Sequence, residues 1–325
     1  MKCDLHRHLG GSIRPNTIYD ILRREKRGTY FSVAEVAKDM IDSPNDKRDF
    51  AHFLDKFSIL ETVVWDDWAI KHMITQVSWD IASEGLDYVE IKLTLDKYLR
   101  SPNWTPATVV RFIYDTFMEQ AAKWGFVPAL VLALRYDTDR EQQLKIAKAI
   151  ADPLLADRVV GLDLVGDERM FDADFYKPIF DEWRQAGKGL EAHVGETQNA
   201  ENVRMAIEKL GVKRIAHGIK AADSPDILAM AKERGICFDI ALTSNIDTGA
   251  VKDLATHPVR KMLDQGCAIT IGTDDPVTLS TTLDQEYEKL RHYLELTEDQ
   301  LMDIMHNSFK YAFVDLNTLD SANNP

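Results

Sequence analysis

The 325-residue chain has few cysteines, no long apolar run and no excess of basic residues. Its three cysteines, Cys3, Cys237 and Cys267, are too few and too widely spaced for a disulfide framework or a cysteine-rich zinc site. No apolar stretch approaches the roughly 18 residues needed to span a bilayer. The 39 Lys and Arg against 53 Asp and Glu give a formal net charge of −14. This balance disfavours sequence-independent binding of nucleic acid, which normally uses a basic surface, and leaves a local basic pocket open.

The N-terminal segment also lacks the apolar core of a signal peptide, because Lys2, Asp4 and His6 interrupt it. These absences predict a cytoplasmic protein whose partner is a small molecule rather than a membrane or a nucleic acid. The 45% of hydrophobic residues are enough to fill a large core, which excludes intrinsic disorder. We expect a single domain over residues 1–325, since α/β barrels of this length commonly form one domain.

Eight short apolar runs alternate with stretches that have helical periodicity. Alternating strands and helices require a parallel sheet covered by helices, and eight units predict an α/β fold of the (β/α)8 TIM type. A doubly wound open sheet is the alternative, but its usual glycine-rich turn is represented only by Gly10 and Gly11. The predicted strands are 2–8, 86–93, 127–134, 158–165, 189–193, 213–217, 236–242 and 267–273.

The connection over residues 9–85 is too long for one helix and is expected to be a helical insertion after the first strand. It includes a predicted aromatic helix over residues 49–64, which carries Phe50, Phe53 and Phe57. Residues 284–315 are expected to form additional C-terminal helices.

Histidines and carboxylates gather where the predicted strands end, which is the end at which barrel enzymes build their active sites. His6 and His8 are two residues apart on one strand, so their side chains point to the same side. A hydrogen-bonded structural pair is the alternative for this motif alone, but His193 and Asp274 at two other strand ends favour a metal site. Three imidazoles and a carboxylate suit zinc or another first-row divalent ion, with room for a water.

Two other metal-site patterns are absent. Many barrel hydrolases hold two metals through a carbamylated lysine on the fourth strand, but here that strand ends at Val165 and Gly166 without one. We therefore expect one metal ion per chain. The zinc signature of cytidine deaminases is missing too, because His193 and Glu196 are three residues apart and no CxxC exists.

Three further residues at strand ends have acid–base chemistry. Glu196 could donate a proton if burial raises its pKa, although a carboxylate at a helix N-terminus is the alternative. His217 could orient or deprotonate a water, or be a satisfied core histidine. Asp275 could accept a hydrogen bond in the site, or be an ordinary turn residue. Together these groups predict hydrolytic attack on an unsaturated carbon.

The whole chain resembles the adenosine deaminase family of the amidohydrolase superfamily. The HxH, HxGE, AHG and TDDP motifs occur in the family's order, and their combination is highly specific. The matching segments are KCDLHRHLGGSI (2–13), FAHFLDKF (50–57), DYVEIKL (87–93), GLDLVGDE (161–168), AHVGE (192–196), RIAHGI (214–219), TSN (243–245), GTDDP (272–276) and NSF (307–309).

The resemblance implies a barrel with one zinc ion that deaminates a 6-aminopurine nucleoside. By position, His6, His8, His193 and Asp274 are similar to the family's zinc ligands, and His8 would also face the substrate. Asp274 and His217 would orient the attacking water and take up its proton.

The resemblance also implies substrate contacts. Glu196 would protonate N1 of the purine, Asp275 would hydrogen-bond N7, and the backbone of Gly166 would meet N3. Phe50 and Phe53 lie in a segment similar to the family's apolar lid, for which an ordinary core-facing helix is the alternative.

Gly10 departs from the family pattern. Adenosine deaminases usually carry Asp or Asn here, where Asp meets the ribose 5′-hydroxyl, and adenine deaminases usually carry Glu. A glycine could leave room for a larger 5′ substituent or for a water, and Arg14 lies four residues further on.

The leading prediction is therefore deamination of adenosine or 2′-deoxyadenosine. One alternative keeps the reaction but uses a 5′-modified substrate, such as aminodeoxyfutalosine, a methylthio nucleoside or N6-methyl-AMP. A metal-dependent ester or lactone hydrolase is a second alternative, and a non-catalytic purine-binding protein is a third.

Overall fold

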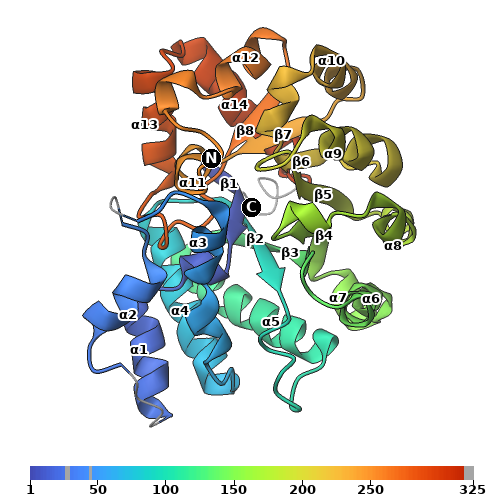
Figure 1. The fold of residues 1–325 in the computed structure, drawn as a ribbon. Helices are drawn as coiled ribbons and strands as arrows, with labels where there is room; N and C mark the ends of the chain where they lie inside the picture. Colours follow the sequence, from blue (N-terminus) through green and yellow to red (C-terminus); the bar gives the residue numbers. More distant parts are fainter. Residues whose placement is uncertain (26–29, 44–45, 318–325) are drawn as a thin grey trace.

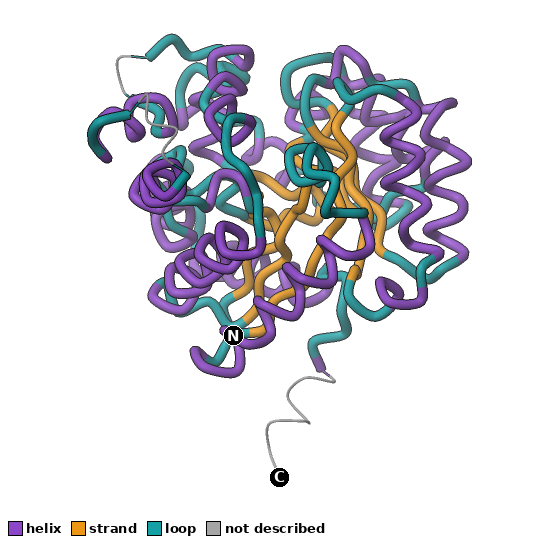
Figure 2. Tube along the Cα trace, turned by 90° about the horizontal axis from the view of Figure 1, so that it is seen from below, coloured by secondary structure: helices purple, strands orange, loops and turns teal. Residues whose placement is uncertain are grey.

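The computed structural model describes residues 1–25, 30–43 and 46–317. Eight strands form one parallel sheet in which each strand pairs with the next along the chain, and helices surround them (Figure 1). In the perpendicular view the strands occupy the middle of the molecule, with helices on both sides (Figure 2). The strands are β1 (Cys3–His8), β2 (Tyr88–Thr94), β3 (Val127–Arg135), β4 (Val159–Val165), β5 (Gly189–Val194), β6 (Arg214–His217), β7 (Cys237–Ile240) and β8 (Ala268–Ile271).

The sheet is nearly closed, because the segment after β8 bonds to β1. The backbone N–H of His8 donates to the carbonyl of Asp274 at 2.7 Å, and the N–H of Asp274 donates to the carbonyl of His6 at 2.6 Å. A parallel bridge pairs Arg7 with Asp274 at the same place. The predicted (β/α)8 barrel is confirmed, and all eight predicted strands are present.

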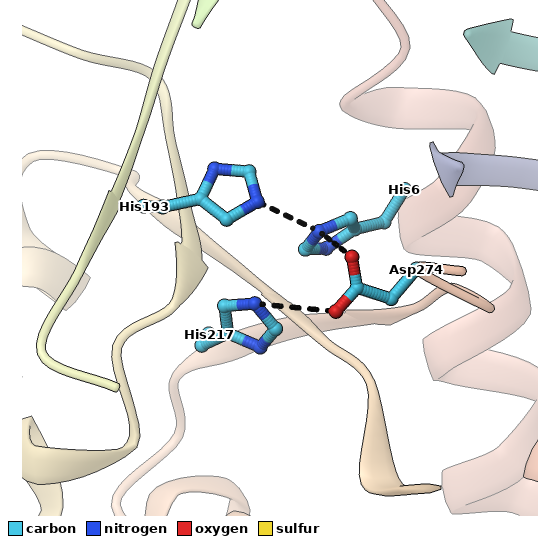
Figure 3. Close-up of side chains that lie close together, drawn as sticks. All are labelled: His6, His193, His217 and Asp274. Atoms are coloured by element: carbon cyan, nitrogen blue, oxygen red, sulfur yellow. Dashed lines mark hydrogen bonds and ion pairs between the residues drawn. The ribbon is translucent and has the colours of Figure 1, made fainter. Parts of the chain in front are cut away.

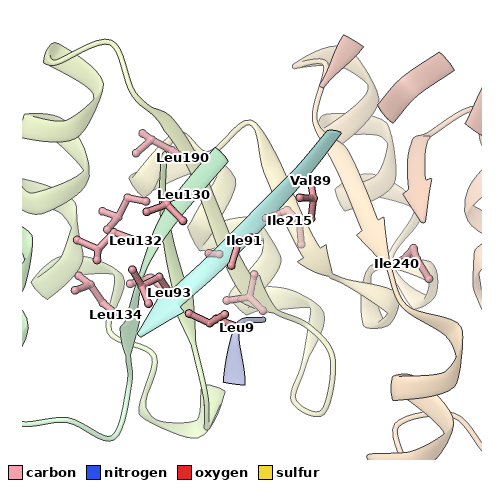
Figure 4. Packing of buried hydrophobic residues seen from close by; sticks show 14 of the residues in the cluster. Leu9, Val89, Ile91, Leu93, Leu130, Leu132, Leu134, Leu190, Ile215 and Ile240 are labelled. Atoms are coloured by element: carbon pink, nitrogen blue, oxygen red, sulfur yellow. The ribbon is translucent and has the colours of Figure 1, made fainter. Parts of the chain in front are cut away.

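The two sides of each strand bury different kinds of residue. Figure 4 shows apolar side chains of β2 and β3, such as Ile91 and Leu132, packed beside one another in the hydrophobic core. Because successive side chains alternate between the faces of a strand, Glu90 and Lys92 face the barrel interior instead. Lys92 Nζ lies 2.7 Å from Asp163 Oδ2 in this interior. The barrel is therefore apolar toward its helices and charged along its axis.

Four of the helices between strands begin at capping side chains. Thr105, Asp139, Asp172 and Asn199 each accept a hydrogen bond from the N–H three residues further on, which satisfies a donor that the helix leaves free. After β2 the helices are α5 (Pro106–Trp124), α6 (Arg140–Ala147), α7 (Pro153–Ala156), α8 (Ala173–Gln185), α9 (Ala200–Met205), α10 (Pro225–Glu233), α11 (Leu242–Asp247), α12 (Val259–Asp264), α13 (Leu283–Tyr293) and α14 (Glu298–Lys310). No helix in the described ranges is long and apolar enough to cross a membrane.

The insertion between β1 and β2 contains several helices, as predicted, but the aromatic helix is shorter than expected. It ends at Asp55 and is followed by a 3-10 turn, Ser58–Glu61, because the chain tightens where Phe57 N–H bonds to the Leu54 carbonyl. The Phe57 ring then packs edge-on against Phe53, with ring centroids 5.4 Å apart. The helices of the insertion are α1 (Pro15–Arg24), α2 (Val33–Met40), α3 (Phe50–Asp55) and α4 (Asp67–Ser83).

Phe313 packs at the end of the barrel where the strands begin. A Cβ atom added to Gly189 would lie 2.1 Å from the Phe313 ring, and one added to Gly161 would lie 2.5 Å from it. The guanidinium of Arg214 stacks on the ring at 3.8 Å, and Phe313 N–H donates to Glu90 Oε1 at 2.6 Å. The two glycines are therefore required by the close approach of this ring.

We expect Gly189→Ala to destabilise the protein by about 1–3 kcal/mol, because the added methyl group must displace Phe313. In a Phe313→Ala background the same substitution is expected to cost much less, since the obstructing ring is gone. Urea denaturation of the four proteins measures this double-mutant cycle. An equal loss of unfolding free energy in both backgrounds would show that Phe313 is not the reason for glycine at position 189.

Candidate active site

Four of the side chains predicted from strand ends converge in a buried group at the carboxyl end of the barrel (Figure 3). One potential ligand atom from each of His6, His193, His217 and Asp274 lies within 4.8 Å of the others. His8 joins them, since its Nε2 lies 3.2 Å from both His193 Nε2 and Asp274 Oδ1. The structure therefore brings together five residues that are separated by up to 268 positions in the chain.

Two of these residues adopt an unusual backbone conformation. His217 has φ of 60° and Asp274 has φ of 59°, in the left-handed region that residues other than glycine rarely occupy. Asp274 is held there by its backbone bonds to β1, which point its carboxylate toward His6. Such conformations persist where the surrounding structure fixes them, and they are common at functional sites.

The hydrogen bonds of His6 and His193 leave two lone pairs facing each other. His6 Nδ1 lies 3.3 Å from the carbonyl oxygen of Asp239, and His193 Nδ1 lies 3.1 Å from Asp163 Oδ1. Both oxygens are acceptors, so each neutral ring carries its proton on Nδ1 and a lone pair on Nε2. The two Nε2 atoms are 3.0 Å apart. Converging lone pairs beside a carboxylate are what a metal cation requires, and the residues present fit a divalent ion.

Asp163 and Lys92 support His193 from inside the barrel and were not among the predicted site residues. Lys92 Nζ lies between Asp163 Oδ2 at 2.7 Å and Glu191 Oε2 at 2.5 Å. The Lys92 and His193 contacts hold the pKa of Asp163 well below its usual range despite complete burial. A charged residue within the apolar strand GLDLV was the available signal in the sequence.

Glu196 is buried and keeps a proton near neutral pH. Its Oε1 accepts hydrogen bonds from Asn245 Nδ2 and Thr248 Oγ1, both at 3.0 Å. Burial, with smaller contributions from Asp274 and Glu168, raises the pKa of Glu196 to about 8. A protonated carboxylic acid therefore lies next to the His–Asp group, with Oε2 3.8 Å from His217 Nε2.

Glu168 holds the loop that carries Glu196. Its two carboxylate oxygens accept the backbone N–H groups of Gly195, Thr197 and Gln198, each at 2.6 Å. Charge-assisted bonds of this kind are stronger than neutral ones, so the loop after β5 is rigidly placed. The sequence analysis includes Glu168 in the segment GLDLVGDE but assigns it no role.

A chain of hydrogen bonds sets the proton position on His217. The backbone N–H of Val259 donates to His257 Nδ1 at 3.1 Å, and burial lowers the pKa of His257 to about 3, so its one proton is on Nε2. That proton is donated to Asn245 Oδ1 at 3.2 Å, which turns the amide nitrogen toward Glu196 and toward His217 Nδ1 at 3.1 Å. Burial also holds the pKa of His217 well below its usual range. The neutral His217 therefore carries its proton on Nε2, which faces Asp274 Oδ2 at 3.6 Å.

Asp275 is buried against Gly11. A Cβ atom at position 11 would lie 1.9 Å from Asp275 Oδ1, so only glycine leaves room for this carboxyl group. Burial and the adjacent charge of Asp274 raise the pKa of Asp275 well above its usual range. The carboxyl group of Asp275 therefore lies on the wall of the site and releases its proton at a higher pH than an exposed aspartate does.

One pocket contains all the predicted site residues except His6, which lies beneath it. Aromatic and aliphatic side chains of the insertion cover one side, among them Phe50, Phe53 and Leu60. Gly10 and Gly166 form part of the wall. The pocket thus combines an apolar cover with a polar floor, as expected for a site that binds a flat, partly apolar ligand.

We expect Asp163→Asn to weaken metal binding about 10- to 100-fold, because the charged acceptor for His193 Nδ1–H is lost. Competition with a chromophoric chelator measures the affinity, and circular dichroism checks the fold. Asp174→Asn on the exposed start of α8 is the matched control. Unchanged affinity in the Asp163 variant would contradict its supporting role.

The chain matches the adenosine deaminase family over residues 1–321. The adenosine deaminase of Serratia proteamaculans is 30% identical over 314 residues, which cover 96% of this chain and 93% of that protein. The fold is similar to that of an adenine deaminase from Arthrobacter aurescens, with a TM-score of 0.85, 22% identity and coverage of 98% and 96% of the two chains. It is also similar to that of a Burkholderia ambifaria amidohydrolase with bound zinc, with a TM-score of 0.88, 23% identity and coverage of 98% and 87%. On this evidence the chain belongs to the adenosine deaminase family.

Proposed function

We propose that the protein hydrolyses the exocyclic amine of a 6-aminopurine nucleoside, converting adenosine or 2′-deoxyadenosine to inosine or 2′-deoxyinosine and ammonia. The observation that carries this proposal is the buried carboxyl group of Glu196, whose pKa burial raises to about 8, beside the converging His–Asp group on the floor of one pocket. Family membership and relatives named adenosine deaminase support the same reaction.

The metal-binding residues are proposed to be His6, His8, His193 and Asp274. Their three imidazoles and one carboxylate suit zinc among the divalent ions. When bound, such an ion lowers the pKa of a coordinated water and so makes a nucleophile available at neutral pH.

His217 and Asp274 are proposed to position the water that attacks C6. His217 presents Nε2–H, which would donate a hydrogen bond to the oxygen of the water and so orient it. The Asp274 carboxylate, with Oδ2 3.6 Å from that nitrogen, is the adjacent acceptor for the proton that the water loses.

Glu196 is proposed to donate its proton to N1 of the purine as the water oxygen bonds to C6. C6 then becomes tetrahedral, and the proton taken up by Asp274 passes to the amino group, so that the C6–N bond breaks with release of ammonia. The proton of the C6 hydroxyl returns to Glu196 as the 6-oxo product forms. Hydrogen bonds from Asn245 and Thr248 fix Oε1, so the carboxyl group approaches N1 in one orientation.

The remaining predicted residues are proposed to hold the purine. Asp275, whose raised pKa favours the protonated form, faces N7, which is an acceptor, and the backbone of Gly166 meets N3. His8 lies beside the reacting carbon, while Phe50 and Phe53 cover the ring and exclude water.

Glu196→Gln tests the acid directly. We expect kcat for adenosine to fall by about 10² to 10⁴, because the amide has no acidic proton to donate, while the metal content is unchanged. An ultraviolet assay follows the conversion, and Glu201→Gln on exposed α9 is the control. A fully active Glu196 variant would instead favour an ester or lactone hydrolase.

His257→Leu tests the hydrogen-bond chain behind His217. Without the Nε2–H donor, Asn245 can reverse its amide, and we expect kcat to fall about tenfold or more while KM changes little. His257→Gln, which retains a donor, is expected to recover part of the loss. An unchanged kcat in the leucine variant would mean that Asn245 is held by other contacts.

A further inference from the structure

Lys97 places an unpaired ammonium in the wall of the active-site pocket. It lies in the turn after β2, and only 8% of its surface is exposed. Among the described residues, none accepts a hydrogen bond from its Nζ or pairs with it within 4.0 Å. Its neighbours are instead the faces of Tyr98 and Trp65, with ring centroids 5.1 and 6.0 Å from Nζ. The side chain is buried, but Nζ itself faces the pocket, where no described residue accepts its N–H donors and a ligand could supply an acceptor.

The other cations of the pocket wall are already paired. Lys92 contacts Asp163 and Glu191, and Arg135 contacts Asp137 and Glu61. Of the three carboxyl groups whose charge acts on Lys97, Asp275 packs on Gly11, and the other two have partners elsewhere. These are Asp96, which accepts from Thr138 and Gln142, and Glu61, which binds Arg100 and Arg135.

Gly10 leaves the Lys97 ammonium open to the ligand. A Cβ atom at position 10 would lie 3.8 Å from Lys97 Nζ, 3.7 Å from Phe57 and 3.4 Å from Leu60. A longer side chain at this position would therefore cover the ammonium. Burial, as the largest cause, lowers the pKa of Lys97 to about 8, so the group is still mostly protonated at neutral pH.

The position of Lys97 corresponds to the sugar end of the substrate. This step rests on the proposed function, in which C6 faces the His–Asp group and Asp275 faces N7. Asp275 packs on Gly11, so the N7 edge of the purine lies beside the chain at Gly10 and Gly11. In a purine only C8 separates N7 from N9, which carries the sugar. The 5′ end of the nucleoside therefore lies close to Gly10 and Lys97.

We propose that Lys97 binds an anionic group at the 5′ end of the nucleoside, so that the preferred substrates carry a 5′-phosphate or a 5′-carboxylate. Both groups offer charged oxygens that can accept from the ammonium, and such bonds are stronger than bonds to a neutral hydroxyl. Gly10 has no side chain to contact this anionic group, but it leaves the space that the group needs to reach Lys97. Adenosine, with its uncharged 5′-hydroxyl, is then a slower substrate.

The test compares kcat/KM of the metal-loaded full-length protein for four compounds. They are adenosine, adenosine 5′-phosphate, adenosine-5′-carboxylic acid and the bulky neutral 5′-deoxy-5′-methylthioadenosine. We expect at least one anionic compound to exceed adenosine by about tenfold or more. The methylthio compound separates charge from size, and the two anionic compounds show which acid is preferred.

Variants of Lys97 and its neighbours test whether the preference for anionic substrates depends on this residue. Lys97→Met is expected to lower the anion-to-adenosine ratio of kcat/KM by about tenfold or more, and Lys97→Arg to retain a preference for the anion. Gly10→Asp, which places a carboxylate beside Nζ, is expected to lower the same ratio. Lys123→Met, on the exposed surface of α5, is the matched control and is expected to keep it.

Calorimetry with inosine and inosine 5′-phosphate provides a readout that does not depend on turnover. The wild-type protein is expected to bind the phosphate more tightly, and Lys97→Met to remove most of the difference. An unchanged ratio in Lys97→Met, or a methylthio compound as good as both anions, would overturn the role of Lys97. If the wild-type protein deaminates none of the compounds, the proposed function fails, and the calorimetric comparison alone decides whether Lys97 binds an anion.

Discussion

The closure of the barrel between the segment after β8 and β1 is the interaction on which the active site depends. Two short backbone hydrogen bonds join Asp274 to His6 and His8, and they place the carboxylate of Asp274 against both imidazoles. The same contact holds Asp274 in the left-handed backbone region, so the strain is located at the proposed reacting centre. A barrel that did not close here would separate the first and last of the proposed metal ligands.

The polar interior of the barrel determines which nitrogen of each imidazole carries the proton. Asp163 accepts a hydrogen bond from His193 Nδ1–H, and the carbonyl of Asp239 accepts one from His6 Nδ1–H. The Nε2 lone pairs of both rings therefore point to the same place. At His217 the arrangement is reversed, because Asn245 donates to Nδ1 and leaves the proton on Nε2. The hydrogen-bond partners behind each ring thus decide its proposed role. His6 and His193 are proposed metal ligands, and the neighbouring His217 is a proposed hydrogen-bond donor.

The floor of the pocket and its wall at Gly10 differ in chemistry. Its floor holds Glu196 and the His–Asp group, which lie in motifs that resemble those of the adenosine deaminase family. Its wall at Gly10 departs from that pattern and exposes the ammonium of Lys97. We propose that the floor determines the reaction and that the wall determines which nucleoside is preferred, so that the two properties could change independently.

The sequence by itself determined the barrel and the residues at its strand ends, because both are encoded locally. Apolar runs of strand length alternate with helical stretches, and the HxH spacing puts two imidazoles on one side of a strand. The end of α3 at Asp55 was not predicted, since it depends on Phe57 turning back onto Phe53.

Only the tertiary structure decided the partners of these residues. The contacts of Glu168 with Gly195, of Asn245 with Glu196 and of Lys92 with Glu191 join positions 27, 49 and 99 residues apart. Lys97 was not singled out for the same reason, because a lysine indicates a ligand site only once its surroundings are known to lack an acceptor. Hydrogen bonding and burial depend on which segments the fold brings together, and no local pattern in the sequence records that.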